Sequence, residues 1–162
     1  MTHKHTDGHE CEYCNASKEE MKQKENSMIE KHGWYAHFII NEPDLPYNTN
    51  VHTHGLKESL DHPDLQICMG MSPATCHSIL INAIEDNIKQ GIKFEPGSKY
   101  GNIIKPAPGY KGIEYKVLFL EAEEGGRTVL RMIFPDTDGG FDGPMSKQLE
   151  GCKIPEGLKL SA

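Results

Sequence analysis

The segment from Pro73 to Gln90 constrains the fold most, because it carries the broadest apolar stripe in the sequence. Ser72 and Pro73 have the residue types of an N-cap and a first helical position, and Gly91 follows the last residue of the pattern. A helix of this kind needs an apolar partner surface, so we expect it to pack across one face of a sheet. The stripe consists of residues at three- and four-residue steps, namely Cys76, Ile79, Leu80, Ala83, Ile84 and Ile88.

Five further segments have the composition of strands. Three of them precede this helix, and the other two flank a short Gly-containing turn at 123–126 that predicts a hairpin. The segments are WYAHFIIN (34–41), TNVHTHGL (49–56), DLQICMGM (64–71), IEYKVLFLEA (113–122) and RTVLRMIF (127–134). A surface helix is expected over Ser17–His32, where Ser17 and Glu20 form a capping box and Gly33 ends the pattern.

The order of these segments favours an α+β fold, because helices and strands do not alternate regularly. We expect a single domain with a mostly antiparallel sheet of about five strands, one main packed helix and an N-terminal surface helix. The predicted boundaries are a His- and Cys-rich N-terminal segment at 1–16, either disordered or a zinc knuckle, the α+β domain at 17–142, and an irregular C-terminal segment at 143–162.

Charge and composition narrow the class of partner. The formal net charge is −7, from 24 acidic against 17 Lys and Arg residues, and no basic run is present, so no nucleic-acid partner is expected. No apolar stretch approaches the roughly 20 residues that a membrane helix needs, and we expect a soluble cytoplasmic protein without a membrane partner. The five Cys residues are mostly scattered, which favours reduced thiols. These features are compatible with a protein partner or a homo-oligomer.

Several short motifs resemble, in type and order, the motifs of the family called domain of unknown function 4262. They run from Cys11-Glu12-Tyr13-Cys14 through HGW (32–34), HTHGLKESLDHPDL (52–65), the helix opened by Pro73 and GIKFEPG (91–97) to MIFPDTDGGF (132–141). The resemblance implies domain limits of about 11 to 142 and no catalytic residues. It matches Cys11 and Cys14 to the leading Cys pair of the family, and Gly55-Leu56, His62-Pro63 and Pro135-Asp136 to its short blocks. His52 and His54 replace an aromatic and an aliphatic residue there, which implies that any role for them belongs to a subgroup.

The first candidate site is a zinc site at the N-terminus. Cys11 and Cys14 have the C-x-x-C spacing that lets two thiolates reach one tetrahedral Zn²⁺, and His9 is close enough in sequence to be a third ligand. His32 is the favoured fourth ligand, ahead of His3, His5 and Cys152. A solvated tail without metal fits the same residues, and a redox role for the Cys pair is less favoured because no strand precedes it.

The second candidate site is formed by His52, His54 and His62. His52 and His54 are two residues apart on an expected strand and should project from one face, and His62 follows after a short connection, with Asp61 or Asp64 available to orient a ligand. Three imidazoles with an open fourth position suit a catalytic zinc ion. The alternative reading is polar His on an exposed sheet face. The sequence therefore predicts a binding or assembly module with an N-terminal zinc site, or else a metal-dependent hydrolase, and leaves substrate and partner open.

Overall fold

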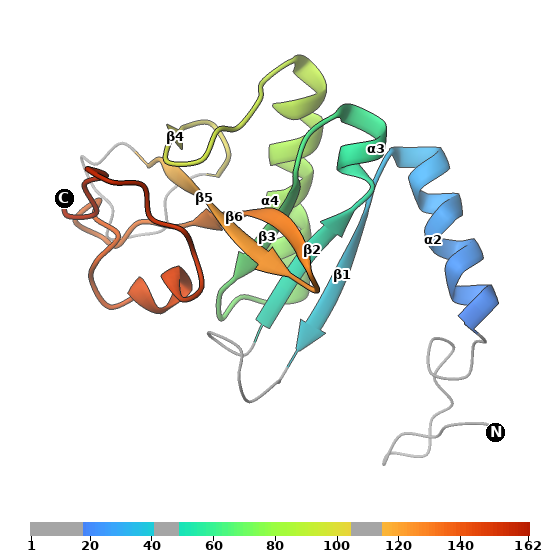
Figure 1. Cartoon of the computed structure of the whole chain (residues 1–162), viewed down its shortest axis with the longest axis horizontal. Coiled ribbons are helices and arrows are strands. Elements are labelled where there is room, and N and C mark those ends of the chain that lie inside the picture. The colour runs from blue at the N-terminus through green and yellow to red at the C-terminus, as the bar shows by residue number, and fades with distance from the viewer. Residues whose placement is uncertain (1–17, 41–48, 105–114) are drawn as a thin grey trace, which may run out of the picture.

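The computed structural model describes residues 18–40, 49–104 and 115–162. They form a six-stranded sheet in the order β1-β2-β3-β6-β5-β4, flanked by a few helices (Figure 1). The strands are β1 Tyr35–Ile40, β2 Thr49–His54, β3 Asp64–Cys68, β4 Lys99–Tyr100, β5 Val117–Glu124 and β6 Arg127–Ile133. The helices are α2 Lys18–His32, α3 Leu56–Leu60 and α4 Pro73–Glu85, with 3₁₀ turns η2 Ile88–Gln90 and η3 Ser146–Leu149.

The predicted α+β class is confirmed, and the sheet is mostly antiparallel. Neighbouring strands pair antiparallel except for β3 and β6, which run parallel and join the first three strands to the hairpin. The sheet has six strands instead of about five, because the two-residue edge strand β4 lies outside the five segments that have the composition of strands. A short helix, α3, also lies in the connection between β2 and β3, where the sequence pattern predicted no helix.

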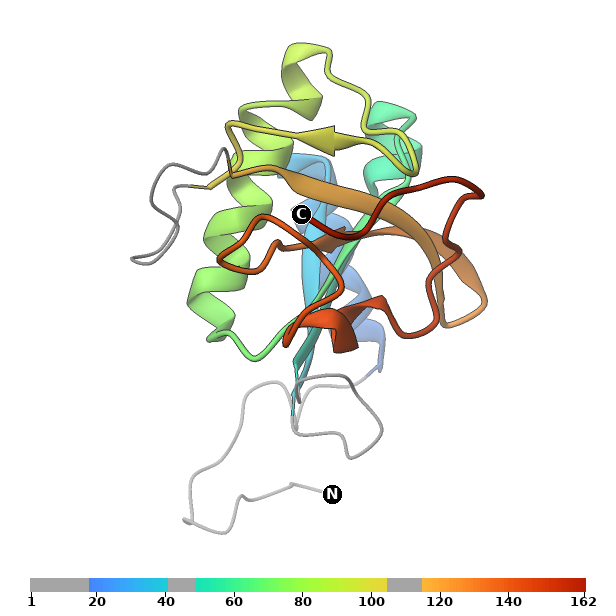
Figure 2. The same cartoon turned by 90° about the vertical axis from the view of Figure 1, so that its left-hand side faces the viewer.

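Helix α4 lies along one face of the sheet, as its apolar stripe predicts (Figure 2). It begins at Pro73, where Ser72 accepts a hydrogen bond from the backbone N–H of Thr75. It is shorter than predicted, because the α-helix stops at Glu85 and the chain continues through η2 to Gly91. The buried side chains of its stripe pack against residues of the sheet, among them Leu65, Ile67, Phe119, Leu130 and Met132.

The opposite face of the sheet has two regions of different character. Over β5 and β6, a second apolar cluster forms with the C-terminal segment and contains Leu118, Leu120, Ile133 and Phe141, with Leu149, Leu158 and Leu160 packed against it. Leu118 and Leu120 flank Phe119 of the main core, so the strand period of two separates the clusters onto the two faces. Over β1, β2 and β3 this face instead carries polar side chains, and it is called the polar face below.

Helix α2 lies at the surface and buries none of its residues. Two contacts link the region around its C-terminal end to α4 and η2. Lys89 Nζ of η2 donates a hydrogen bond to the backbone oxygen of His32 at 3.0 Å, and the indole N–H of Trp34, which precedes β1, donates to Glu85 of α4 at 3.3 Å. Neither α2 nor any other helix in the described part of the chain combines the length and apolar character needed to cross a bilayer.

Candidate metal centre

Three His side chains gather on the polar face, at the edge of the sheet. His52 and His54 alternate with buried residues along β2, and His37 of β1 lies directly opposite His52 in the antiparallel pair. Directly opposite residues project from the same face, so the strand register alone places the three imidazoles together. One ring nitrogen from each lies within 4.8 Å of the others, and the Nε2 atoms of His52 and His54 are 3.1 Å apart.

The rings of this cluster also pack against one another. The ring centroids of His37 and His52 are 4.9 Å apart, and those of His52 and His54 are 4.8 Å apart, both close to edge-on. Tyr35 pairs with His54 across the strands and stacks on its ring at 4.9 Å. The Tyr35 hydroxyl in turn hydrogen-bonds the Glu25 carboxylate of α2, and burial with that carboxylate raises the pKa of Tyr35 to about 12. Helix α2 therefore helps to position Tyr35, which covers one side of the cluster.

Exposure increases from His52 to His37. His52 is only 4% exposed, His54 is half-buried, and His37 is exposed on the edge strand. The β5–β6 hairpin contributes to this burial, because its tip crosses the polar face (Figure 1) and Glu124, the last residue of β5, reaches Asn50 and Gln66 on β2 and β3. The cluster is thus closed at His52 and open to solvent at His37.

Both inner imidazoles are neutral at pH 7. Burial lowers the pKa of His52 to about 4, with the neighbouring His54 acting in the same direction. The pKa of His54 is also lowered, first by burial and then by the positive charge of Arg127. Neutral imidazole is the form that binds a metal, so no proton has to be removed from these rings before an ion can bind.

The Nδ1 atom of His52 has an unusual environment. Within the ranges that the structure describes, it is the one buried side-chain nitrogen or oxygen without a hydrogen-bond partner. The nearest carboxylate oxygen, Oε1 of Glu124, is 3.9 Å away, beyond hydrogen-bond distance. A buried polar atom left unpaired costs about 1–3 kcal/mol, so its position calls for an explanation.

The structure does not bring His62 to this cluster. His62 is buried against Phe94, and both of its ring nitrogens form hydrogen bonds with the backbone. Asp61 is exposed and pairs with Lys57 at 3.0 Å. Asp64 is buried and accepts hydrogen bonds from Thr53, from the N–H of Leu56 and from Arg127, which makes it a structural junction between β2, α3 and β6.

Most of the predicted N-terminal zinc site lies outside the described residues, including Cys11, Cys14, His9 and the alternatives His3 and His5. His32 is described and is exposed at the C-terminal end of α2. Cys152 is half-buried in the C-terminal segment, where burial raises the pKa of its thiol.

Sequence reasoning missed His37 and Glu124. His37 stands at an alternating position of its strand, but only the register of β1 against β2 shows that it faces His52. Glu124 is 72 positions after His52, inside the segment expected to be a turn. The available signal was the period of two along β1, which puts Tyr35 and His37 on one face.

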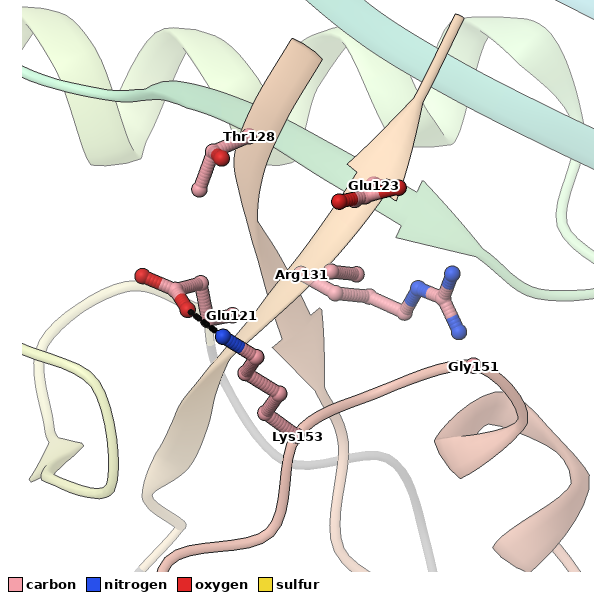
Figure 3. A pocket seen from close by; sticks show the side chains of 7 residues that line it. Glu121, Glu123, Thr128, Arg131, Gly151 and Lys153 are labelled. Carbon is pink, nitrogen blue, oxygen red and sulfur yellow. Dashed lines mark ion pairs between the residues drawn. The ribbon is translucent and has the colours of Figure 1, made fainter. Parts of the chain in front are cut away.

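A separate pocket of about 340 Å³ lies between the hairpin and the C-terminal segment (Figure 3). Glu121 and Lys153 form an ion pair at 3.4 Å on one side of it, and the guanidinium of Arg131 extends toward Gly151 on the other. Arg131 is 5% exposed and donates hydrogen bonds to the backbone oxygens of Gln148 and Glu150. These contacts attach the C-terminal segment to the sheet, so Arg131, Glu121 and Lys153 already have a structural role at this pocket.

No curated protein matches the chain, and no solved structure does. The model of a protein family, the domain of unknown function family DUF4262, matches residues 28–144. The match covers the sheet, α4 and the three His residues. The chain therefore belongs to the DUF4262 family.

Proposed function

We propose that this protein is a metal-binding module that holds one divalent transition-metal ion, zinc in the first place, through His37, His52 and His54. The observation that carries the proposal is the convergence of three ring nitrogens within 4.8 Å. Two nitrogens bound to one tetrahedral zinc ion at about 2.0–2.1 Å lie roughly 3.4 Å apart. The Nε2 atoms of His52 and His54 are already 3.1 Å apart, so an ion would need little rearrangement of the inner pair.

The protein environment supports a metal in preference to a simple packing role. His52 and His54 are both held neutral, as metal ligands must be. His52 and His54 project from β2 and His37 projects from β1, and the backbone hydrogen bonds between these paired strands fix the spacing of the rings before any ion arrives. Three imidazoles form a donor set that suits zinc, copper, nickel or iron more than calcium or magnesium.

A second candidate function, metal-assisted hydrolysis, uses the same site. The exposure of His37 favours it, because solvent can reach the ion on that side. Three imidazoles leave one tetrahedral position for water, and zinc lowers the pKa of such a water to near neutrality. His37 replaces His62 in this version of the hydrolase hypothesis. A zinc-dependent rate of p-nitrophenyl ester hydrolysis that disappears in His37→Ala would support it; an equal rate in zinc-free protein would contradict it.

The N-terminal site built from Cys11, Cys14, His9 and His32 stays a separate prediction. It would bind its own ion, so the two sites must be distinguished by variants. A Cys11→Ser, Cys14→Ser background removes the thiolates and leaves the strand cluster intact. Any zinc that this background retains with a stoichiometry of one belongs to a site without Cys11 and Cys14.

The test is zinc retention by untagged protein in that background, measured by elemental analysis after loading and removal of excess metal. We expect one zinc per chain in the background itself, and the same in His77→Ala, which removes an exposed His of α4 as a matched control. We expect loss of zinc in His37→Ala, which should fold normally because His37 is exposed, and in His54→Gln. Equal zinc in His37→Ala and in the background, or none in either, overturns the proposal.

A further inference from the structure

We propose that Glu124 is the positioning residue of this centre: its carboxylate accepts the Nδ1–H of His52 and thereby directs the Nε2 lone pair of His52 toward the ion. The inference rests on the proposed function, because it names a further residue of the same site. Metal-bound His side chains commonly donate their second N–H to a carboxylate or a carbonyl, which fixes both the tautomer and the ring orientation.

The first observation is that a donor position and a carboxylate oxygen face each other, and that neither makes a hydrogen bond within the described residues. His52 Nδ1 is buried without a partner, and Glu124 Oε1 faces it from 3.9 Å. An N–H···O hydrogen bond is about 0.9 Å shorter than this separation, so a small rotation of the imidazole or the carboxylate closes it. No second carboxylate is paired with His52 in the described residues.

The second observation is that the other oxygen of Glu124 is fully engaged. Oε2 accepts hydrogen bonds from Asn50 Nδ2 at 3.0 Å and from Gln66 Nε2 at 2.9 Å. The Gln66 amide also donates to the Asn50 side-chain oxygen at 3.1 Å. These contacts hold the carboxylate in place and leave Oε1 as the oxygen that faces His52.

The direction of this network is set by Arg131, whose guanidinium has donors and no acceptor. Arg131 Nε donates to Gln66 Oε1 at 2.8 Å, so the Gln66 amide must present its oxygen to Arg131 and its NH₂ group to Glu124. Arg131 is itself anchored by the backbone oxygens of Gln148 and Glu150. The C-terminal segment therefore supports the orientation of Glu124 through two side chains.

Replacement of Glu124 by Gln gives a sharp test, because an amide has one oxygen and one NH₂ group. Two donors meet at the position of Oε2, so the amide oxygen of Glu124→Gln must lie there. The NH₂ group of this amide then faces His52 Nδ1. That nitrogen has to accept a hydrogen bond, so the proton of the neutral ring moves to Nε2. The variant keeps the hydrogen bonds that Asn50 and Gln66 donate, but it holds His52 in the tautomer that cannot bind metal through Nε2.

The experiment compares wild type, Glu124→Gln and Glu123→Gln, which makes the same charge change at the neighbouring exposed position. Long-range ¹H–¹⁵N NMR of the metal-free proteins should show the Nδ1–H tautomer of His52 in wild type and Glu123→Gln, and the Nε2–H tautomer in Glu124→Gln. The zinc Kd, from competition with a chelating dye, should rise about 10- to 100-fold in Glu124→Gln alone. Thermal midpoints should stay close to wild type.

The outcomes separate the two proposals. An unchanged His52 tautomer in folded Glu124→Gln, or an unchanged zinc Kd, overturns the role of Glu124 while leaving the metal site standing. A wild-type protein that binds no zinc overturns the proposed function, and this inference with it. If Glu124→Gln does not fold, Glu124→Ala serves instead: a mixture of His52 tautomers with weaker zinc binding supports the inference, and the Nδ1–H tautomer alone contradicts it.

Discussion

The Nε2 atom of His62 accepts a hydrogen bond from the backbone N–H of Phe94, 3.1 Å away, so the lone pair of this nitrogen is not available to bind a metal ion. Because Nε2 is the acceptor, the proton of the neutral ring lies on Nδ1, which donates to the backbone oxygen of Pro63 at 2.8 Å. His62 is 2% exposed and its ring packs edge-on against Phe94. It therefore connects the end of α3 to the segment after η2.

Replacing His62 with Ala should lower the free energy of unfolding by about 2 kcal/mol or more, because the buried N–H of Phe94 loses its acceptor. Zinc retention by the folded variant should equal that of wild type, since His62 binds no ion. Urea denaturation and elemental analysis measure the two quantities. A variant of unchanged stability that loses its zinc would reverse both expectations and return His62 to the metal site.

The sequence predicted the parts of the site that depend on local periodicity. His52 and His54 are two positions apart on a strand, and a period of two places them on one face whatever the rest of the fold does. His37 and Glu124 depend on strand pairing instead. A shift of one residue between β1 and β2 would turn His37 to the other face, and no tight turn motif in the intervening sequence fixes that register.

The fold shows the same difference between local patterns, which the sequence reveals, and long-range strand pairing, which it does not. The apolar stripe of α4 and the hairpin of β5 and β6 are local patterns, and both are present. The parallel pairing of β3 with β6 joins residues more than sixty positions apart, such as Asp64 and Val129, and no local pattern specifies it. His62 was misplaced for a related reason: its partner is the backbone N–H of Phe94, which composition does not reveal.

The metal-free protein should lose stability as the pH falls from about 6.5 to about 4. The pKa of His52 is about 4 in the folded protein and 6.5 when unperturbed, so the unfolded chain binds a proton first and unfolding becomes easier in this window. The contribution of His52 is present in full above pH 6.5 and amounts to roughly 3 kcal/mol, from about 1.36 kcal/mol per pKa unit. His54 and His62, whose pKa values are also lowered, act in the same direction.

Urea denaturation at several pH values in the presence of a chelator measures this dependence. His52→Gln should show a shallower loss of stability than wild type between pH 6.5 and 4, because it lacks the shifted group. Parallel curves for the two proteins would mean that His52 titrates normally in the folded state.

Leu80→Ala should destabilise the protein by about 2–5 kcal/mol, the range for removing a fully buried Leu side chain. Leu80 is completely buried between α4 and the sheet, whereas the adjacent Ile81 is 37% exposed. Ile81→Ala is therefore the matched control and should cost much less. Chemical denaturation of both variants measures the difference, and equal midpoints would place the apolar stripe of α4 outside the core.

Gly55→Ala should damage both the fold and the metal site, because Gly55 joins His54 to α3 in a conformation that only glycine adopts easily. Its φ is +102°, and an added Cβ would lie 2.9 Å from the backbone oxygen of Gly33 and 3.0 Å from Ile29 Cγ1. Gly33 lies just before β1, so relieving this contact moves β1 away from β2 and His37 away from His52. We expect a loss of unfolding free energy of several kcal/mol, about 1–3 of it from backbone strain, and a weaker zinc Kd.

Gly91→Ala is the control for this prediction. Gly91 has a similar φ of +98° but open space around the position of a Cβ, so Gly91→Ala carries the backbone strain without the clash. It should lose only about 1–3 kcal/mol and bind zinc like wild type, because Gly91 lies after η2 and outside the metal centre. Equal losses in the two variants would show that strain alone acts at Gly55, and an unchanged zinc Kd in Gly55→Ala would mean that the approach of Gly33 to Gly55 does not set the spacing of His37 and His52.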